Sequence, residues 1–258
     1  MPTIPVNDIE ICYESFGDPE APPLLLVMGL GAQMTLWSPG FVSELLDRGF
    51  RVIRFDNRDV GLSTKSDGPP PDVMAMYAAF AAGHPIEAPY TLSLLAADAV
   101  GLLDALEIPA AHIVGASMGG MIVQTMAIEH PDRVLSLTSI MSTTGHTEVG
   151  QPDPEAMMAL LSPVPEGRAA AIEATLNTSR LIAGDLFDEA ESRRIATESY
   201  DRCFHPAGTM FQIAAVAASG DRTDGLEQLD VPTLVIHGRQ DPLVTLSGGE
   251  ATAKAVPG

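Results

Sequence analysis

Residues 112–124, HIVGASMGGMIVQ, contain a serine between glycines at the end of an apolar, β-branched run. The run predicts a strand, and the apolar residues after the glycines predict a helix. A serine on a sharp strand-to-helix turn needs small neighbours, and Gly115, Gly119 and Gly120 are such neighbours. The G-x-S-x-G pattern in this setting indicates Ser117 as a nucleophile. The alternative is a loop serine that only caps the helix.

Strands and helices alternate along most of the chain. Apolar runs predict strands at 9–17, 22–29, 51–61, 111–117 and 134–142, and a last strand that ends in a turn within 231–242. Helical spacing of apolar residues is found at 41–50, 91–108, 118–129 and 247–255, whereas the Pro- and Gly-rich residues 65–91 predict an irregular connection. The alternation predicts an α/β fold, with a mostly parallel, doubly wound sheet.

The alternation is interrupted once, at residues 146–226, where the pattern is helical and polar and predicts no strand. An insertion at this point would lie over the ends of the parallel strands, where ligands bind in such folds. We therefore predict a helical cap at 146–226, and a core made of residues 1–145 and 227–258.

Composition limits the classes of function. The 258 residues carry 34 Asp and Glu but 14 Lys and Arg, a formal charge of −20, which would repel nucleic acid and is typical of an acidic, soluble surface. Cys12 and Cys203 are far apart and indicate neither a disulfide framework nor a metal site, and no cofactor is expected. The N-terminus has no signal-peptide pattern, and no apolar segment reaches about 18 residues. We expect a cytoplasmic protein that does not enter a membrane.

Acyl transfer at Ser117 also needs oxyanion donors and an acid. The backbone amide of Met118 is one candidate donor, and the amide of Leu30, after the strand at 22–29, is the other. Asp241 follows a strand in a turn fixed by a proline, and is the candidate acid. The alternatives are that Gly29 and Gly31 only form a strand-to-helix turn, and that Asp241 only forms a turn without any chemistry.

Six segments together carry a resemblance to a known family: LLLVMGLGAQ, VIRFDNRDVGLS, LAADAVGLLDAL, HIVGASMGG, HPDRVLSLTSIMS and VPTLVIHGRQDP. The chain resembles the α/β-hydrolases, in the group of aclacinomycin methylesterase and the cofactor-free haloperoxidase-like or perhydrolase-like esterases. The resemblance covers the chain except the cap, and implies Ser117 as nucleophile, Asp241 as acid, and Leu30 and Met118 as oxyanion donors. Many relatives have a histidine where this chain has Met28, a difference that leaves the backbone donor in place.

A general base is expected about 25 to 30 residues after Asp241, beyond Gly258. Three of the six histidines lie in predicted core elements that cannot reach Ser117, and three are weak surrogate candidates: His112, His130 and His237 in the first group, and His84, His146 and His205 in the second. The sheet also lacks a final strand and closing helix. We expect that a longer chain supplies them with the histidine, and that a protein of these 258 residues alone is nearly inactive.

These features predict a serine hydrolase that cleaves a carboxylic ester of a small or mid-sized apolar compound through an acyl-enzyme. Apolar residues near or in the cap are candidates for the substrate pocket or for ordinary packing: Met141, Met157, Met158, Leu160, Leu161 and Met210. One alternative is C–C bond hydrolysis or perhydrolysis at the same residues. Another is a non-catalytic binding protein or pseudoenzyme with this fold.

Overall fold

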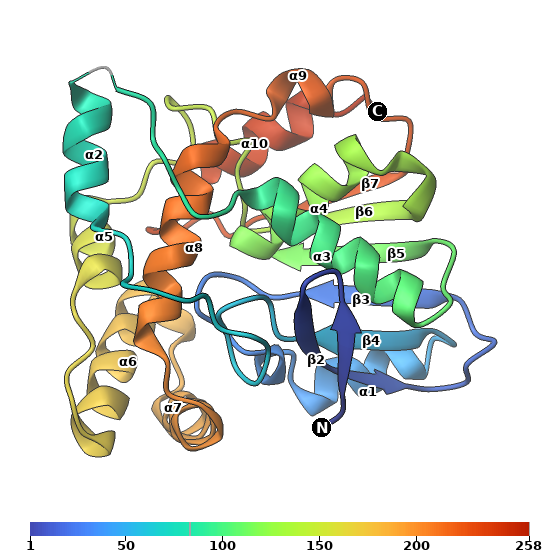
Figure 1. The fold of residues 1–258 in the computed structure, drawn as a ribbon, viewed down its shortest axis with the longest axis horizontal. Helices are drawn as coiled ribbons and strands as arrows, with labels where there is room; N and C mark the ends of the chain where they lie inside the picture. Colours follow the sequence, from blue (N-terminus) through green and yellow to red (C-terminus); the bar gives the residue numbers. More distant parts are fainter. Residues whose placement is uncertain (83, 258) are drawn as a thin grey trace.

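One sheet of seven strands forms the centre of the computed structural model, which describes residues 1–82 and 84–257 (Figure 1). Its order is β1-β2-β4-β3-β5-β6-β7. The strands are β1 (Thr3–Val6), β2 (Ile9–Phe16), β3 (Pro23–Val27), β4 (Arg51–Phe55), β5 (Ala111–Ala116), β6 (Val134–Ile140) and β7 (Thr233–Ile236). The pairs β1–β2 and β2–β4 are antiparallel and the other pairs are parallel. The predicted α/β class with a mostly parallel sheet is confirmed.

The central strands are buried on both faces, which explains their unbroken apolar sequences. Leu25 of β3, which is fully buried, lies between Ile53 of β4 and Ile113 of β5. Two apolar clusters pack on the sheet, one with α1 (Pro39–Leu46) and the other with α3 (Leu92–Ala105) and α4 (Met118–Glu129). Near the C-terminus, α10 (Leu246–Ala255) packs against β7 and α9 (Thr223–Leu226).

Four of the five α-helices between β6 and β7 lie together at one end of the sheet, and we refer to them as the cap helices (Figure 1). They are α5 (Pro154–Leu161), α6 (Arg168–Ala183), α7 (Glu189–Arg202) and α8 (Pro206–Ser219). Residues 146–226, all of which the structure describes, contain no strand, in agreement with the sequence pattern. The exact division between core and cap stays a prediction.

Two elements differ from the sequence prediction. The chain begins with β1, which forms a hairpin with β2 through a tight turn at Asn7, where φ is 52°. The region 65–91 contains α2 (Val73–Ala81) and is therefore not irregular throughout. Proline and glycine are frequent in this region, but the nine residues of α2 include neither, and α2 contacts α8. Local composition therefore underestimated a helix that packs on the cap.

Two kinds of feature are absent from the residues that the structure describes. In residues 1–82 and 84–257, no helix combines the length and the apolar character needed to cross a membrane. Within the same residues, no three or more His, Cys, Asp or Glu side chains gather as metal ligands would.

Candidate active site

Ser117 lies at the turn between β5 and α4, with φ at 55° and ψ at −121°. A non-glycine residue with positive φ is strained, and such strain gathers at functional sites. The turn is held by the Ser117 amide, which donates a hydrogen bond to the Ile140 carbonyl on β6 (2.8 Å). Ser117 is only half-buried, although Ala116 and Met118 beside it are buried. The turn therefore brings a hydroxyl out of a closely packed backbone.

The glycines around Ser117 are required by close backbone contacts. A Cβ atom at Gly115 would lie 2.1 Å from the Gly119 carbonyl oxygen, and one at Gly119 would lie 2.1 Å from the Val27 carbonyl oxygen. At Gly120 the nearest atom would be the Ser142 Cβ, at 2.5 Å. No side chain fits at these distances, so the small residues around the predicted strand-to-helix turn are explained by packing.

The loop after β3 packs against the Ser117 turn. A Cβ atom at Gly29 would lie 3.1 Å from the Ser117 Cβ, so this backbone passes directly beside the serine. The Asn57 side chain holds the loop by donating to the Met28 carbonyl (2.9 Å). Neither the Leu30 amide nor the Met118 amide has an acceptor among the residues that the structure describes. Two free N–H groups are thus available beside Ser117.

Asp241 occupies the turn after β7, as the sequence predicted. Its Oδ1 accepts hydrogen bonds from the amides of Leu243 and Val244, both at 2.9 Å. Its Oδ2 lies 3.7 Å from Nε2 of His237, which is bonded to the Val244 carbonyl at 2.7 Å. One carboxylate oxygen therefore organises a turn whose residues Leu243 and Val244 line the same cavity as Ser117.

The six histidines are distributed over the molecule. Among the described residues, none is hydrogen-bonded to the Ser117 hydroxyl. His112 on β5 pairs with Ser136, and His237 is held by Val244. The ring nitrogen of His146 accepts from the Glu148 amide, and His205 has a buried Nε2 without a partner among those residues. The prediction that the base is none of these six stays a prediction.

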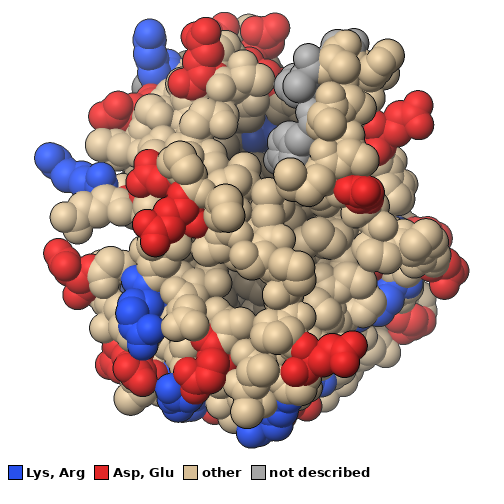
Figure 2. All heavy atoms as spheres, turned by 90° about the vertical axis from the view of Figure 1, so that its left-hand side faces the viewer, with Lys and Arg blue, Asp and Glu red and all other residues tan. Residues whose placement is uncertain are grey.

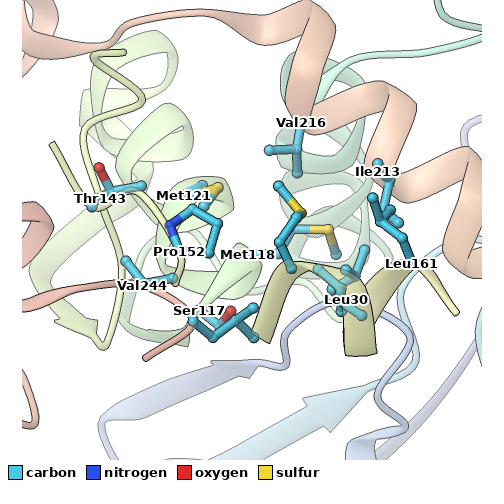
Figure 3. A pocket seen from close by; sticks show the side chains of 14 residues that line it. Leu30, Ser117, Met118, Met121, Thr143, Pro152, Leu161, Ile213, Val216 and Val244 are labelled. Atoms are coloured by element: carbon cyan, nitrogen blue, oxygen red, sulfur yellow. The ribbon is translucent and has the colours of Figure 1, made fainter. Parts of the chain in front are cut away.

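Ser117 opens into an apolar cavity of about 160 Å³ (Figure 3). Cavities of about this size hold a benzene ring in other proteins. Figure 3 shows the side chains of Ile213 and Val216, both on α8, and that of Leu161 across the cavity from Ser117. The full lining is Leu30, Ser117, Met118, Met121, Thr143, Gly150, Pro152, Met157, Leu160, Leu161, Ile213, Val216, Leu243 and Val244.

Three of the six apolar residues predicted for the pocket line the cavity: Met157, Leu160 and Leu161. Met141 and Met158 are instead exposed by 40% and 71%, and Met210 is not in the lining. The sequence reasoning missed Ile213 and Val216, although their spacing on a helix would have indicated a shared face. Thr143 and Pro152 lie in irregular segments that carry no periodic signal.

The described cavity lining contains no charged side chain. The buried Arg222 lies behind it, and its Nη2 donates to the Thr143 carbonyl at 2.9 Å. Burial lowers the pKa of Arg222 to about 10, so the guanidinium stays charged at neutral pH. Its hydrogen bonds are to the Gln124 side chain and to backbone carbonyls. The arginine therefore stabilises the wall of the cavity.

Comparison with known proteins is consistent with this geometry. A profile described as alpha/beta hydrolase fold matches residues 22–258. Rhodomycin D methylesterase DnrP of Streptomyces peucetius is 29% identical over 283 residues, covering 100% of this chain and 89% of the relative. The 3-oxoadipate enol-lactonase 2 of Acinetobacter baylyi is 27% identical over 248 residues, covering 96% of this chain and 82% of that protein.

Solved structures extend the similarity. The enol-lactonase of Burkholderia xenovorans superposes with a TM-score of 0.71 at 27% identity, over 100% of this chain and 88% of that one. A meta-cleavage product hydrolase of Pseudomonas fluorescens gives a TM-score of 0.75 over 100% of this chain and 86% of that one. At 22% identity the second similarity concerns the fold alone.

Proposed function

The chain belongs to the alpha/beta hydrolase fold family, and from that premise we propose that it is a serine hydrolase that cleaves a carboxylic ester of a small or mid-sized apolar compound. The observation that carries the proposal is Ser117 on a strained turn, with its side chain at an apolar cavity. Relatives named as a methylesterase and an enol-lactonase act on ester bonds, in support of this reaction.

In this proposal the Ser117 hydroxyl oxygen attacks the ester carbonyl carbon, and the alcohol leaves from a tetrahedral intermediate. The resulting acyl-enzyme is then hydrolysed by water. A base must take the serine proton and return it to the leaving alcohol. Asp241 would orient that base, a role supported by its position in the turn beside the cavity.

The amides of Leu30 and Met118 would stabilise the negative oxygen of the intermediate. Both lack an acceptor among the described residues, and both belong to residues of the cavity lining. Backbone donors fixed before the reaction need no reorganisation when charge develops, so each contributes about 10²- to 10³-fold to kcat.

The cavity favours an uncharged substrate. Its described lining is apolar apart from Ser117, Thr143 and backbone groups, so a carboxylate bound there would be desolvated without a partner. The reaction centre would therefore accept an ester whose acyl or alcohol group is neutral. The cavity of about 160 Å³ suits a small molecule, and a charge of −20 opposes binding to nucleic acid.

The test uses protein produced from the complete gene. We expect turnover of p-nitrophenyl butyrate, labelling by a fluorophosphonate probe, and loss of both in Ser117→Ala. For p-nitrophenyl monosuccinate, which carries a carboxylate, kcat/KM should be lower by about 10²-fold, since an unpaired buried charge is strongly disfavoured. Leu161→Arg would place a cation in the cavity lining, and it should bring kcat/KM for the monosuccinate closer to that for the butyrate.

Outcomes that contradict the proposal are equally definite. Tight binding of apolar ligands without labelling of Ser117 would favour the non-catalytic alternative. Faster cleavage of a β-diketone than of the ester would favour C–C hydrolysis, and peracid formation from acetate and peroxide would favour perhydrolysis.

A further inference from the structure

The loop formed by residues 29–31, which we call the donor loop, is held at its start by the Asn57 bond to the Met28 carbonyl and internally by the Ala32 amide, which donates to the Gly29 carbonyl (3.2 Å). Gly31 has φ at 64°, a conformation open to glycine, and the loop lies between β3 and the short 3-10 turn at Met34–Leu36. The Leu30 amide must nevertheless be held in a fixed position to act as an oxyanion donor, because a shift of about 1 Å in a catalytic group can lower the rate by 10²-fold. The Gly31 end of the loop therefore also needs a fixed partner.

The Gln212 side chain of α8 contacts this loop directly. Its Oε1 accepts a hydrogen bond from the Gly31 amide at 2.8 Å, and its Nε2 donates to the Arg58 carbonyl at 2.9 Å. Gln212 is fully buried, so neither bond is exchanged with bulk water. One side chain thus connects a cap helix to the donor loop and to the segment after β4.

The loop has little freedom around this bond. A Cβ atom at Gly31 would lie 2.7 Å from Oγ1 of Thr209, one turn before Gln212 on α8. The next part of the loop is also tied to the cap, since Gln33 donates to the carbonyls of Ser199 (2.7 Å) and Cys203 (3.0 Å). The cap helices α7 and α8 therefore hold the segment at Gly31 and at Gln33.

We propose that Gln212 is a positioning residue, which fixes the Leu30 amide as an oxyanion donor by binding the adjacent Gly31 amide. This inference rests on the proposed function, and it assigns the cap a second role besides lining the cavity through Ile213 and Val216. Gln212 acts through the backbone and has no role in contacting the substrate.

The variant Gln212→Met keeps the length of the side chain and removes both hydrogen-bonding groups. With p-nitrophenyl butyrate, kcat is expected to fall about 10- to 100-fold, while KM stays within about threefold. The reason is that the weakened interaction, between the Leu30 amide and the oxyanion, is made only in the transition state. Hydrogen–deuterium exchange of a peptide covering residues 28–34 is expected to accelerate, since the Gly31 amide loses its acceptor.

Gln124→Met is the matched control. Gln124 is also a fully buried glutamine with both ends bonded, to the Ser139 hydroxyl (3.1 Å) and Nε of Arg222 (3.2 Å), and its side chain has no bond to the donor loop. A general loss of stability would affect both variants alike. The control is expected to retain the wild-type exchange of residues 28–34, because Gln124 has no bond to the donor loop.

An unchanged kcat or an unchanged exchange of residues 28–34 in Gln212→Met would overturn the inference, as would an equal acceleration of that exchange in the control. A wild-type protein that hydrolyses no ester would refute the proposed function. In that case the exchange measurement alone decides whether Gln212 holds the donor loop, because it does not depend on turnover.

Discussion

The backbone of Ser117 is strained at a position where glycine would be relaxed. With φ at 55°, the residue stores about 1 to 3 kcal/mol of conformational strain. Glycine releases this strain but gains more entropy in the unfolded chain, which offsets about 0.5 to 1 kcal/mol. We expect Ser117→Gly to be about 1 kcal/mol more stable than Ser117→Ala in urea unfolding. Equal stabilities would contradict strain at this turn.

Gly119 faces the backbone of β3, which cannot move aside. A Cβ atom there would lie 2.1 Å from the Val27 carbonyl oxygen, so Gly119→Ala should destabilise the protein by about 3 kcal/mol or more. A Cβ atom at Gly40 in α1 would meet no neighbouring group within 4 Å, and Gly40→Ala should stabilise by about 0.5 to 1 kcal/mol. In thermal unfolding, Gly119→Ala should lower Tm and Gly40→Ala should raise it. A small change of Tm in Gly119→Ala would contradict the tight packing.

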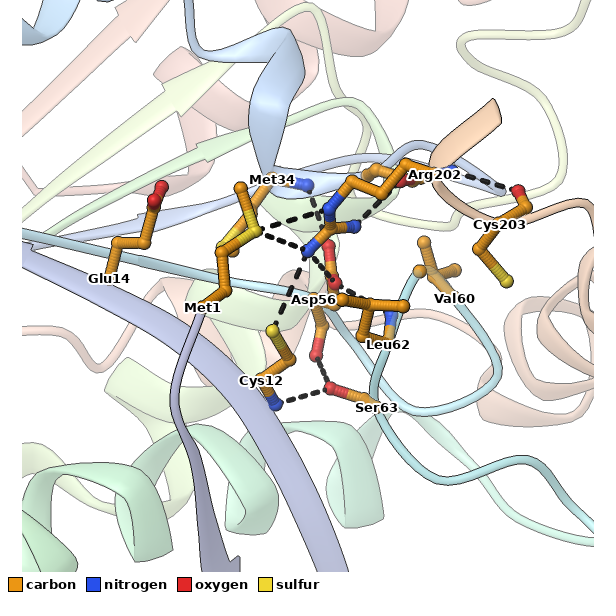
Figure 4. A network of polar contacts seen from close by, with 12 residues as sticks. Met1, Cys12, Glu14, Met34, Asp56, Val60, Leu62, Ser63, Arg202 and Cys203 are labelled. Atoms are coloured by element: carbon orange, nitrogen blue, oxygen red, sulfur yellow. Dashed lines mark hydrogen bonds and ion pairs between the residues drawn. The ribbon is translucent and has the colours of Figure 1, made fainter. Parts of the chain in front are cut away.

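At the scale of elements, α7 is fixed to the core by an ion pair at its end (Figure 4). Arg202 lies 2.7 Å from Asp56, which is fully buried and also accepts from the amides of Met34 and Leu62. Arg202→Met leaves this carboxylate without its cation and should cost about 3 kcal/mol in chemical unfolding.

Arg194 offers a control on the same helix. It pairs with Glu191 and Glu198 on the exposed side of α7, where solvent screens the charges. Arg194→Met should therefore have little effect on stability. Similar losses in the two variants would show that the pairing of Arg202 with buried Asp56 stabilises the fold no more than an exposed ion pair does.

The start of α8 responds to pH through His205. Burial, and then the nearby Lys65, lower the pKa of this histidine below its ordinary 6.5, while Asp59 opposes the shift. The unfolded chain therefore binds the proton first as the pH falls, and the free energy of unfolding decreases from pH 6.5 through the lower folded pKa. Urea unfolding between about pH 7 and pH 5 should show a shallower decrease in His205→Gln. The same slope in both proteins would refute this assignment.

For the whole molecule, the dominant electrostatic feature is the charge of −20. Figure 2 shows carboxylates distributed over the face nearest the cap helices, around a hollow in the surface. A field of this sign disfavours the approach of anionic substrates and is screened by salt. Raising the ionic strength should increase kcat/KM for p-nitrophenyl monosuccinate by about threefold and leave that for the neutral butyrate unchanged. A parallel response of the two esters would exclude this effect.

Much of the architecture could be predicted because it depends on residues that are close together in the sequence. In the sequence, apolar runs indicate the buried strands, and small residues around Ser117 between a strand and a helix indicate the sharp turn. The hairpin at β1 and the helix α2 were missed, because β1 is four residues long and α2 lies within a proline-rich region. Short elements depend on their neighbours more than on their own composition.

The sequence by itself determined the α/β class, the helical insertion and the turn that carries Ser117, since each depends on periodicity or on residues close in the chain. Only the tertiary structure decided which cap residues line the cavity, and that Gln212 reaches Gly31 across 181 positions. It also decided that Arg202 meets Asp56. Contacts of this kind depend on how helices pack on a sheet, and that packing cannot be predicted from residues close together in the sequence.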